Sequence, residues 1–144
     1  IGFRDAVNFS FPLPSKKPTK VGEILQKRVK DKYTITDRIW AGHKRRKKEA
    51  MAKGYGFGYV LFQRNSVYTS TISARYWKDG SEILIEQKNK NPRTLTPREA
   101  ARLQGFPEDF RIPVSDVQAY KQFGNAVPVN VIRAIAEELV KHLN

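Results

Sequence analysis

The sequence NPRTLTPREAARLQGFP, at residues 91–107, carries the clearest helix signals of the chain. Thr96 and Glu99 have the spacing of a capping box, in which each side chain accepts a hydrogen bond from the other residue's backbone amide. Pro97 stands at the first helical position, where its missing N–H costs nothing. Gly105 can end the helix in the left-handed conformation. The pattern predicts a helix between these signals.

A second stretch, QAYKQFGNAVPV at residues 118–129, predicts another helix a few residues later. Ser115 is placed to cap its start, Gly124 is placed to stop it, and Pro128 opens a final helix. The apolar positions of that final helix form one stripe, which comprises Val131, Ile132, Ile135, Ala136, Leu139 and Leu143. Such a stripe needs a surface to pack against.

Upstream of these helices the pattern is more broken. Residues 1–11 are apolar and β-prone, and three prolines then mark a linker. We expect a short helix at 21–29 and a longer one at 36–53, which Thr36 caps and Gly54 stops. We also expect strands at 67–74 and 82–86, with a turn at 78–80 between them.

The chain of 144 residues has a formal net charge of +13, which favours a polyanionic partner. Residues 1–53 hold 15 basic and 5 acidic side chains, so this positive charge is concentrated in the first third. There is no cysteine, which excludes disulfides, cysteine-ligated metals and a thiol nucleophile in this chain. We find no metal-ligand cluster, and no apolar run approaches the length of a membrane span.

Two of these stretches resemble sequence blocks of one family. Residues 91–107 are similar to the ninth block of bacterial DNA (cytosine-5) methyltransferases, and residues 118–129 to the tenth. Residues 71–85 resemble the end of the target-recognition domain in the Dcm-like subgroup, and residues 1–4 the tail of the eighth block. The blocks stand in the family's order, so the resemblance spans nearly the whole chain.

The resemblance implies an α+β fold. In it, a small strand-rich target-recognition domain precedes a helical hinge, and C-terminal helices complete a Rossmann-like methyltransferase domain. The implied domains are the end of a catalytic-domain strand at 1–11, the recognition domain at 12–90, the hinge helix at 91–113 and the C-terminal helices at 114–144. The implied location is the bacterial cytoplasm, in association with DNA.

In this family a cysteine thiolate attacks a cytosine turned out of double-stranded DNA, and S-adenosylmethionine gives the methyl group. Because the chain lacks that cysteine, we expect it to be inactive alone. It is then the smaller subunit of a split enzyme, which we favour, or the C-terminal piece of a single-chain one. Its partners are DNA and an N-terminal catalytic subunit or segment. The alternative is a non-catalytic basic DNA-binding module or a regulatory subunit.

Candidate DNA-binding residues lie within the implied recognition domain. The run after His43 is expected to neutralise phosphates, whereas His43 itself is expected to be a polar surface residue. Thr71 and Ile72 correspond to a family pair that touches DNA backbone beside the flipped cytosine. The full set comprises Lys44, Arg45, Arg46, Lys47, Lys48, Gln63, Thr71, Ile72, Arg75 and Lys78; among them Gln63, Arg75 and Lys78 could reach base edges.

By resemblance, the turn formed by Asn125, Ala126 and Val127 lines the S-adenosylmethionine pocket. Many members carry serine where this chain has Ala126, so a hydroxyl contact is lost. The ninth-block residues that we expect to brace the recognition domain are Arg93, Thr96, Arg98 and Glu99. Residues 54–59 are expected to form either a structural turn or a loop pressed close to DNA. Their aromatic rings are expected to pack within the protein rather than to serve as stacking platforms.

Overall fold

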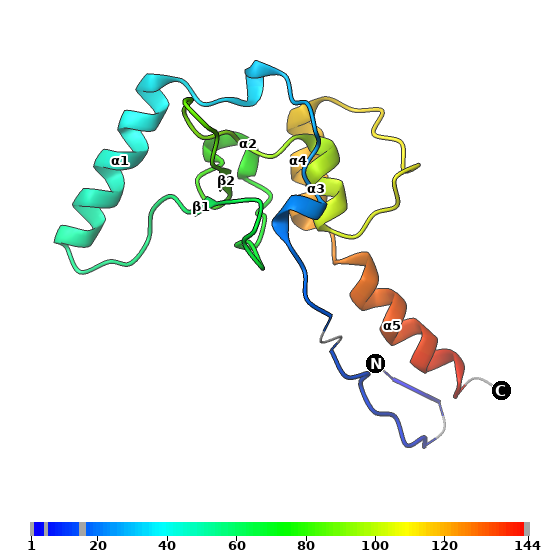
Figure 1. The fold of residues 1–144 in the computed structure, drawn as a ribbon. Coiled ribbons are helices and arrows are strands. Elements are labelled where there is room, and N and C mark those ends of the chain that lie inside the picture. The colour runs from blue at the N-terminus through cyan, green and yellow to red at the C-terminus, as the bar shows by residue number, and fades with distance from the viewer. Residues whose placement is uncertain (1, 5, 15–16, 143–144) are drawn as a thin grey trace.

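The structure is a computed structural model that describes residues 2–4, 6–14 and 17–142, without the side chain of Asp79. Its elements are two 3-10 turns at Val21–Glu23 and Asp31–Tyr33, α1 at Asp37–Ala52, β1 at Leu61–Phe62, α2 at Tyr76–Asp79, β2 at Leu84–Ile85, α3 at Pro97–Leu103, α4 at Asp116–Asn125 and α5 at Val129–Val140. Figure 1 shows a small central body from which α1 projects on one side and α5 on the other.

The central body combines a very short sheet with three helices. β1 and β2 are parallel, with Leu61 opposite Leu84, and Arg93 bridges to the far side of β2. Helix α4 packs against both α2 and α3. The core holds residues from all these elements, among them Phe62, Ile72, Tyr76, Ile83, Leu95, Ala100, Tyr120 and Phe123.

The predicted helix caps at Thr36, Thr96 and Ser115 are confirmed. The Thr36 hydroxyl accepts a hydrogen bond from the Ile39 amide at the start of α1, and Ser115 caps α4 in the same way. Both halves of the capping box at α3 are present. Gly54 and Gly105 adopt φ values of 76° and 75°, in the left-handed region that glycine tolerates best.

The prediction of a helix at 21–29 is wrong beyond Val21–Glu23, which form a short 3-10 turn. The amides of Val21 and Gly22 donate to the carbonyl oxygens of Ser66 and Arg64, each at 2.8 Å. The Gln26 amide donates to the Glu99 carboxylate instead of to a helical carbonyl. This segment is therefore held in an irregular path by partners far along the chain.

Residues 12–90, which the resemblance assigns to a recognition domain, are also not strand-rich. Their described part contains only two strands of two residues each, so the strand expected at 67–74 is absent and that at 82–86 is reduced to Leu84–Ile85. Residues 2–4 and 6–11 form no strand either. The expected turn at 78–80 is the end of α2, which Gly80 closes with φ 56°. Within the 67–74 segment, the backbone of Ser73 and Ala74 lies directly against Gly124 of α4.

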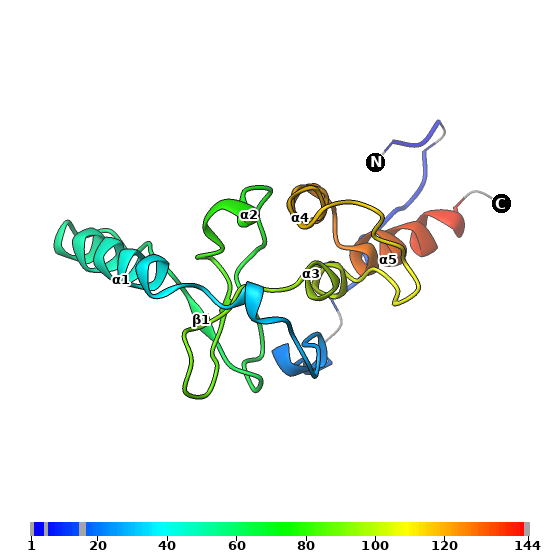
Figure 2. The same ribbon diagram turned by 90° about the horizontal axis from the view of Figure 1, so that it is seen from above.

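Gly124 does not end α4, contrary to the sequence expectation. The helix continues to Asn125, and a Cβ at Gly124 would lie 2.3 Å from the carbonyl carbon and oxygen of Ser73. Glycine is needed there because the helix and the 73–74 backbone touch directly. Figure 2, in which α2 and α4 lie side by side, shows the surroundings of this crossing.

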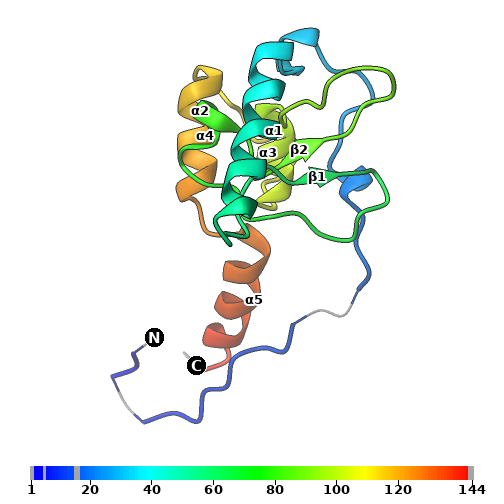
Figure 3. The ribbon, with the colours of Figure 1, turned by 90° about the vertical axis from the view of Figure 1, so that its left-hand side faces the viewer.

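Helix α5 leaves the central body, and none of its described residues is buried. The N-terminal segment runs past the far end of this helix, as Figures 1 and 3 show. There the rings of Phe3 and Phe9 lie 5.9 and 6.0 Å from that of His142. Leu143, the last member of the predicted stripe, lies outside the described residues. Within the described part of the chain, no helix combines the length and apolarity needed to cross a membrane.

Candidate functional site

The basic run of α1 forms an exposed, positively charged face. Lys44, Arg45, Arg46 and Lys48 are exposed, and Lys47 is half-buried. The Lys44 ammonium lies 5.5 Å from the centre of the Trp40 ring, and Arg45 lies 3.6 Å from Glu49. The run therefore keeps most of its positive charge in contact with solvent, as its predicted role requires.

His43 is not the surface residue that the sequence predicts. Only 2% of it is exposed, and its Nδ1 atom lies 2.8 Å from the Arg46 guanidinium. It occupies the inner face of α1, one helical turn from Arg46 and two from the buried Ala50. A basic run thus contains one residue that belongs to the helix's packed side.

The segment after α1 divides its aromatic rings between two roles. Tyr59 packs edge-on against Trp40, with ring centres 4.6 Å apart, which confirms the packing expectation for this residue. Tyr55 and Phe57 are 55% and 68% exposed and stack on each other, so for them that expectation is wrong. The Lys47 ammonium also donates to the Tyr59 carbonyl oxygen at 3.2 Å, which ties this segment to α1.

The predicted pair Thr71–Ile72 is split by the structure. Thr71 is exposed, whereas Ile72 is 3% exposed and belongs to the core. Ile72 therefore anchors this segment, and only the Thr71 side chain is available to another molecule. The signal for this division is the alternation of side-chain direction along an extended chain.

The three residues proposed to read base edges are all exposed but do not form one cluster. The side-chain amide of Gln63 donates a hydrogen bond to the Glu86 carboxylate at 2.6 Å. Arg75 precedes α2, and Lys78 at the end of α2 lies over the Trp77 ring at 5.3 Å. Gln63 thus follows β1 of the sheet. Arg75 stands immediately before α2 and Lys78 within it, and α2 packs against α4.

The proposed cofactor turn lies immediately after the Ser73–Gly124 crossing. Asn125 ends α4, and the Asn125 and Val127 side chains are exposed. Because Gly124 touches the backbone that follows Thr71, the crossing places two predicted sites beside each other. They are more than 50 positions apart in the sequence.

Gln104 holds this turn in place, and the sequence reasoning missed it. Its buried side-chain amide donates to the carbonyl oxygens of Phe123 at 2.6 Å and Ala126 at 3.2 Å. The backbone carbonyl oxygen of Gln104 accepts a hydrogen bond from the Val129 backbone amide. A glutamine at the C-cap of a predicted helix gave no sign that its side chain reaches a later turn.

The predicted brace centres on a buried ion pair. Arg93 donates to both Glu99 carboxylate oxygens, at 2.7 and 2.9 Å. Glu99 is fully buried and also accepts hydrogen bonds from the Thr96 and Gln26 amides, both at 2.8 Å. Four hydrogen bonds satisfy this carboxylate, which offsets the cost of burying a charge. Arg98 lies outside the cluster and donates to the Phe110 carbonyl oxygen.

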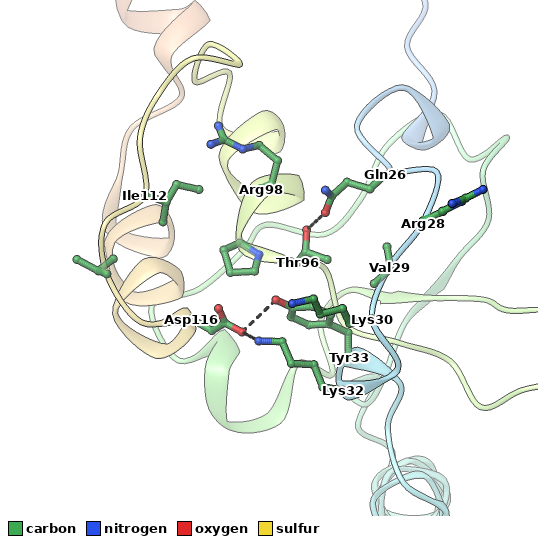
Figure 4. Close-up of a pocket in the computed structure, with 12 residues that line it drawn as sticks. Gln26, Arg28, Val29, Lys30, Lys32, Tyr33, Thr96, Arg98, Ile112 and Asp116 are labelled. Carbon is green, nitrogen blue, oxygen red and sulfur yellow. Dashed lines mark hydrogen bonds and ion pairs between the residues drawn. The ribbon is translucent and has the colours of Figure 1, made fainter.

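A pocket of about 440 Å³ opens between residues 26–33 and the starts of α3 and α4. Figure 4 shows that Asp116 reaches towards Lys32 and Tyr33 there. The carboxylate accepts hydrogen bonds from the Lys32 ammonium at 2.6 Å and the Tyr33 hydroxyl at 3.0 Å. The hydrogen bond from Lys32 holds the pKa of Asp116 below its usual value, and burial raises the pKa of Tyr33. These contacts fasten residues 26–33, the linker that leads into α1, to α4.

Comparisons with known proteins find relatives that match nearly the whole chain. The chain is 61% identical to the type II methyltransferase M.DsaV of Dactylococcopsis salina, over 100% of this chain and 42% of the relative. It is 64% identical to M.SsoII of Shigella sonnei, over 98% and 37% respectively. A DNA-cytosine methyltransferase of Escherichia coli is 40% identical over 96% and 36%. The chain thus spans about two fifths of the length of these relatives.

The fold has solved counterparts at low sequence identity. The Entamoeba histolytica methyltransferase EhMeth matches with a TM-score of 0.72 and 22% identity, over 100% of this chain and 46% of the other. The Dnmt2 methyltransferase of S. pombe gives 0.68 and 17%, over 88% and 43%. The model of the C-5 cytosine-specific DNA methylases matches residues 3–141. Since this match covers nearly the whole chain, the protein belongs to the C-5 cytosine-specific DNA methylase family.

Proposed function

We propose that this chain holds double-stranded DNA and completes the S-adenosylmethionine pocket of an enzyme that methylates carbon 5 of a cytosine turned out of the duplex. The observation that carries this proposal is the Ser73–Gly124 crossing. It sets Thr71, the proposed contact beside the target base, next to the turn that begins at Asn125. Methyl transfer requires the base and the methyl donor to meet, so the two segments that hold them must be neighbours.

The turn after α4 fits a wall of a cofactor pocket. The exposed side-chain amide of Asn125 makes no hydrogen bond to any described residue, so both its donor nitrogen and its acceptor oxygen are available. The exposed Val127 offers an apolar surface beside it. Gln104 keeps the Ala126 carbonyl oxygen turned inward, which leaves those two side chains to face a ligand. S-adenosylmethionine, when bound, supplies the methyl group.

On the DNA side, the exposed face of α1 takes the phosphate backbone. Such contacts supply affinity and set the register but do not read the sequence. Thr71 donates or accepts at the backbone beside the target base, while Gln63, Arg75 and Lys78 are available for base edges. The Arg93–Glu99 cluster ties these segments to the helices, since Glu99 binds the linker through the Gln26 amide.

The remaining catalytic groups come from a complementary N-terminal subunit or segment. The apolar stripe of α5 is only partly covered by the described residues, since none of its members among them is buried. A cavity of about 500 Å³ beside it is lined by Phe11 to Pro14 and by α5 residues such as Ile135. A surface of this kind marks a site of protein–protein contact. The chain has no cysteine, so the attacking thiolate belongs to that other part.

The rival function is a basic module that binds DNA or regulates a methyltransferase without completing it. The net charge of +13 would serve that role equally well. The two functions differ over the exposed stripe of α5, which only the first one uses.

The test combines this chain with a complementary N-terminal part of a methyltransferase and measures transfer of labelled methyl groups from S-adenosylmethionine to DNA. We expect activity in the mixture and none from either part alone. Methyl transfer by this chain alone, or a mixture as inactive as its components, would contradict the proposal. A mixture with the Asn125→Ala variant should show a raised KM for S-adenosylmethionine.

A further inference from the structure

Two of the three aromatic rings between α1 and β1 are mostly exposed and lie outside the core. Tyr55 and Phe57 lie with ring centres 5.4 Å apart and an interplanar angle of 24°, so they stack. Each is more than half exposed, at 55% and 68%. Leaving apolar rings in water is unfavourable. A stacked pair at the surface therefore indicates a partner that covers it.

The glycine between the two rings points the same way. Gly56 does not have a positive φ, and a Cβ added to it would meet nothing within 4 Å. Neither its backbone conformation nor its described surroundings require glycine. A missing side chain at an open position lets another molecule approach the backbone closely.

The surroundings of the pair are strongly basic. The segment starts at the end of α1, whose last turns carry the exposed Lys48, and Lys53 follows them. Lys47 clamps the segment through the Tyr59 ring, whose centre is 4.4 Å from the ammonium, and through close contact with Gly58. A partner that suits both stacked rings and clustered cations has flat apolar faces and negative charge. Nucleic acid combines the two.

We propose that Tyr55 and Phe57 form a stacking platform for bases of the double-stranded DNA that α1 holds by its phosphates. This inference rests on the proposed function, because a duplex from which a base is turned out is distorted and offers base faces that an intact duplex hides. Stacking on an aromatic side chain tolerates any base and depends on contact area rather than on charge. The platform thus adds affinity that salt does not screen, next to a helix whose contribution salt does screen.

The test uses the complete enzyme that contains this chain and a short fluorescein-labelled duplex that the enzyme methylates. Dissociation constants are measured over a range of salt concentrations for the wild type and for the double variant Tyr55→Ser, Phe57→Ser. We expect binding to weaken by about tenfold or more, a change of about 1.4 kcal/mol, at every salt concentration. The salt slope should stay the same, because no cation is lost.

Tyr55→Phe, which keeps the ring, is the matched control and should bind as the wild type does. Because both rings are exposed, the thermal midpoint of the double variant should equal that of the wild type. If the double variant melts at a lower temperature, the binding measurement is made instead with Phe57→Leu, which keeps the bulk of the side chain without the ring. A duplex with 2-aminopurine beside the target cytosine gives a second readout, since stacking on the rings quenches its fluorescence.

Unchanged affinity and unchanged quenching in the variants would overturn the platform, as would a loss that appears only as a lower salt slope. The proposed function would survive this result as long as the wild type methylates the duplex. A wild-type enzyme that binds DNA without methylating it would instead contradict the proposed function.

Discussion

The two long helices of this molecule both project from the central body, yet their exposed faces differ in chemistry. The sixteen residues of α1 include six lysines and arginines, and its inner side is anchored by His43 and Ala50. The twelve residues of α5 include one arginine and two glutamates, and none of its described residues is buried. One helix thus exposes charge and the other exposes an apolar stripe.

The chemistry of a helix's exposed face indicates which kind of molecule binds to it. An exposed basic face is stable in water and gains further free energy when it neutralises phosphates. An exposed apolar stripe is unfavourable in water, so it requires a protein surface to cover it. In our proposal the central body holds two partners at opposite ends, DNA on α1 and the catalytic part on α5.

The largest effect should follow from placing charge on the stripe. Val131→Asp with Ile135→Asp would bury two carboxylates without partners in the docked enzyme, at a cost of several kcal/mol. We expect methyl transfer by the complete enzyme to fall by at least about 1,000-fold, since each tenfold corresponds to about 1.4 kcal/mol. Arg133→Asp, on the polar side of α5, introduces the same group and should leave activity nearly unchanged. Equal losses in both variants would show that the stripe is not the docking face.

The next largest effect should come from the ion pair that connects the two ends. Glu99→Leu would leave Arg93 as a buried charge and remove the acceptor of the Gln26 and Thr96 amides. We expect the free energy of unfolding to fall by about 3 to 5 kcal/mol, measured by chemical denaturation. Glu99→Gln keeps one acceptor oxygen and should be less harmful. If Leu and Gln cost the same, the amide contacts contribute nothing.

A smaller effect is expected at the joint between the target segment and the cofactor turn. Gly124→Ala would force α4 away from the Ser73 carbonyl group, and such overpacking costs about 1 to 3 kcal/mol. Because the displacement separates Thr71 from Asn125, kcat should fall while the dissociation constant for DNA changes little. Gly42→Ala, in the middle of α1, adds the same Cβ where nothing lies within 4 Å and serves as the control. A kcat equal to that of the wild type would disprove the coupling.

The basic helix should affect salt dependence more than stability. Lys44→Gln with Lys48→Gln removes two exposed cations, so the slope of log K against log salt should decrease by about 1.8 for duplex DNA. The thermal midpoint should not move, because neither side chain is packed in the core. Lys141→Gln removes one cation at the end of α5, which would lower the slope by about 0.9 if that end touched DNA, and should leave the slope as it was. A slope that responds equally to both ends would argue against a DNA surface confined to α1.

Much of the helical part of this fold could be predicted from the sequence, because caps are local. Thr36, Thr96 and Ser115 each act on an amide three positions later, so a few residues suffice to place the start of each helix. The family blocks likewise pointed to Arg93 and Glu99, although not to the four hydrogen bonds that the Glu99 carboxylate accepts.

What the sequence could not show depends on contacts between distant residues. Gly124 looks like a helix stop until the Ser73 backbone is placed against it. Gln104 looks like a surface residue until its amide meets the Ala126 carbonyl group. His43 looked exposed because its neighbours are charged, but one face of α1 turns inward. Strands were overpredicted because β-branched residues such as Ile72 also serve a core that has almost no sheet.

The smallest effect should be a pH dependence that arises at neither end of the molecule. Lys32 lowers the pKa of Asp116 in the folded chain, so this carboxylate contributes stability above its unfolded pKa, near 3.8. That contribution is lost as the pH falls through the still lower folded pKa, when Asp116 becomes protonated. Thermal midpoints measured from pH 6 down to about pH 3 should therefore fall more steeply in the wild type than in Asp116→Asn. Since the linker, not α1 or α5, bears Lys32, the DNA salt slope at pH 6 should be the same for both proteins. A slope that changes with Asp116→Asn would mean that the linker, too, contacts DNA.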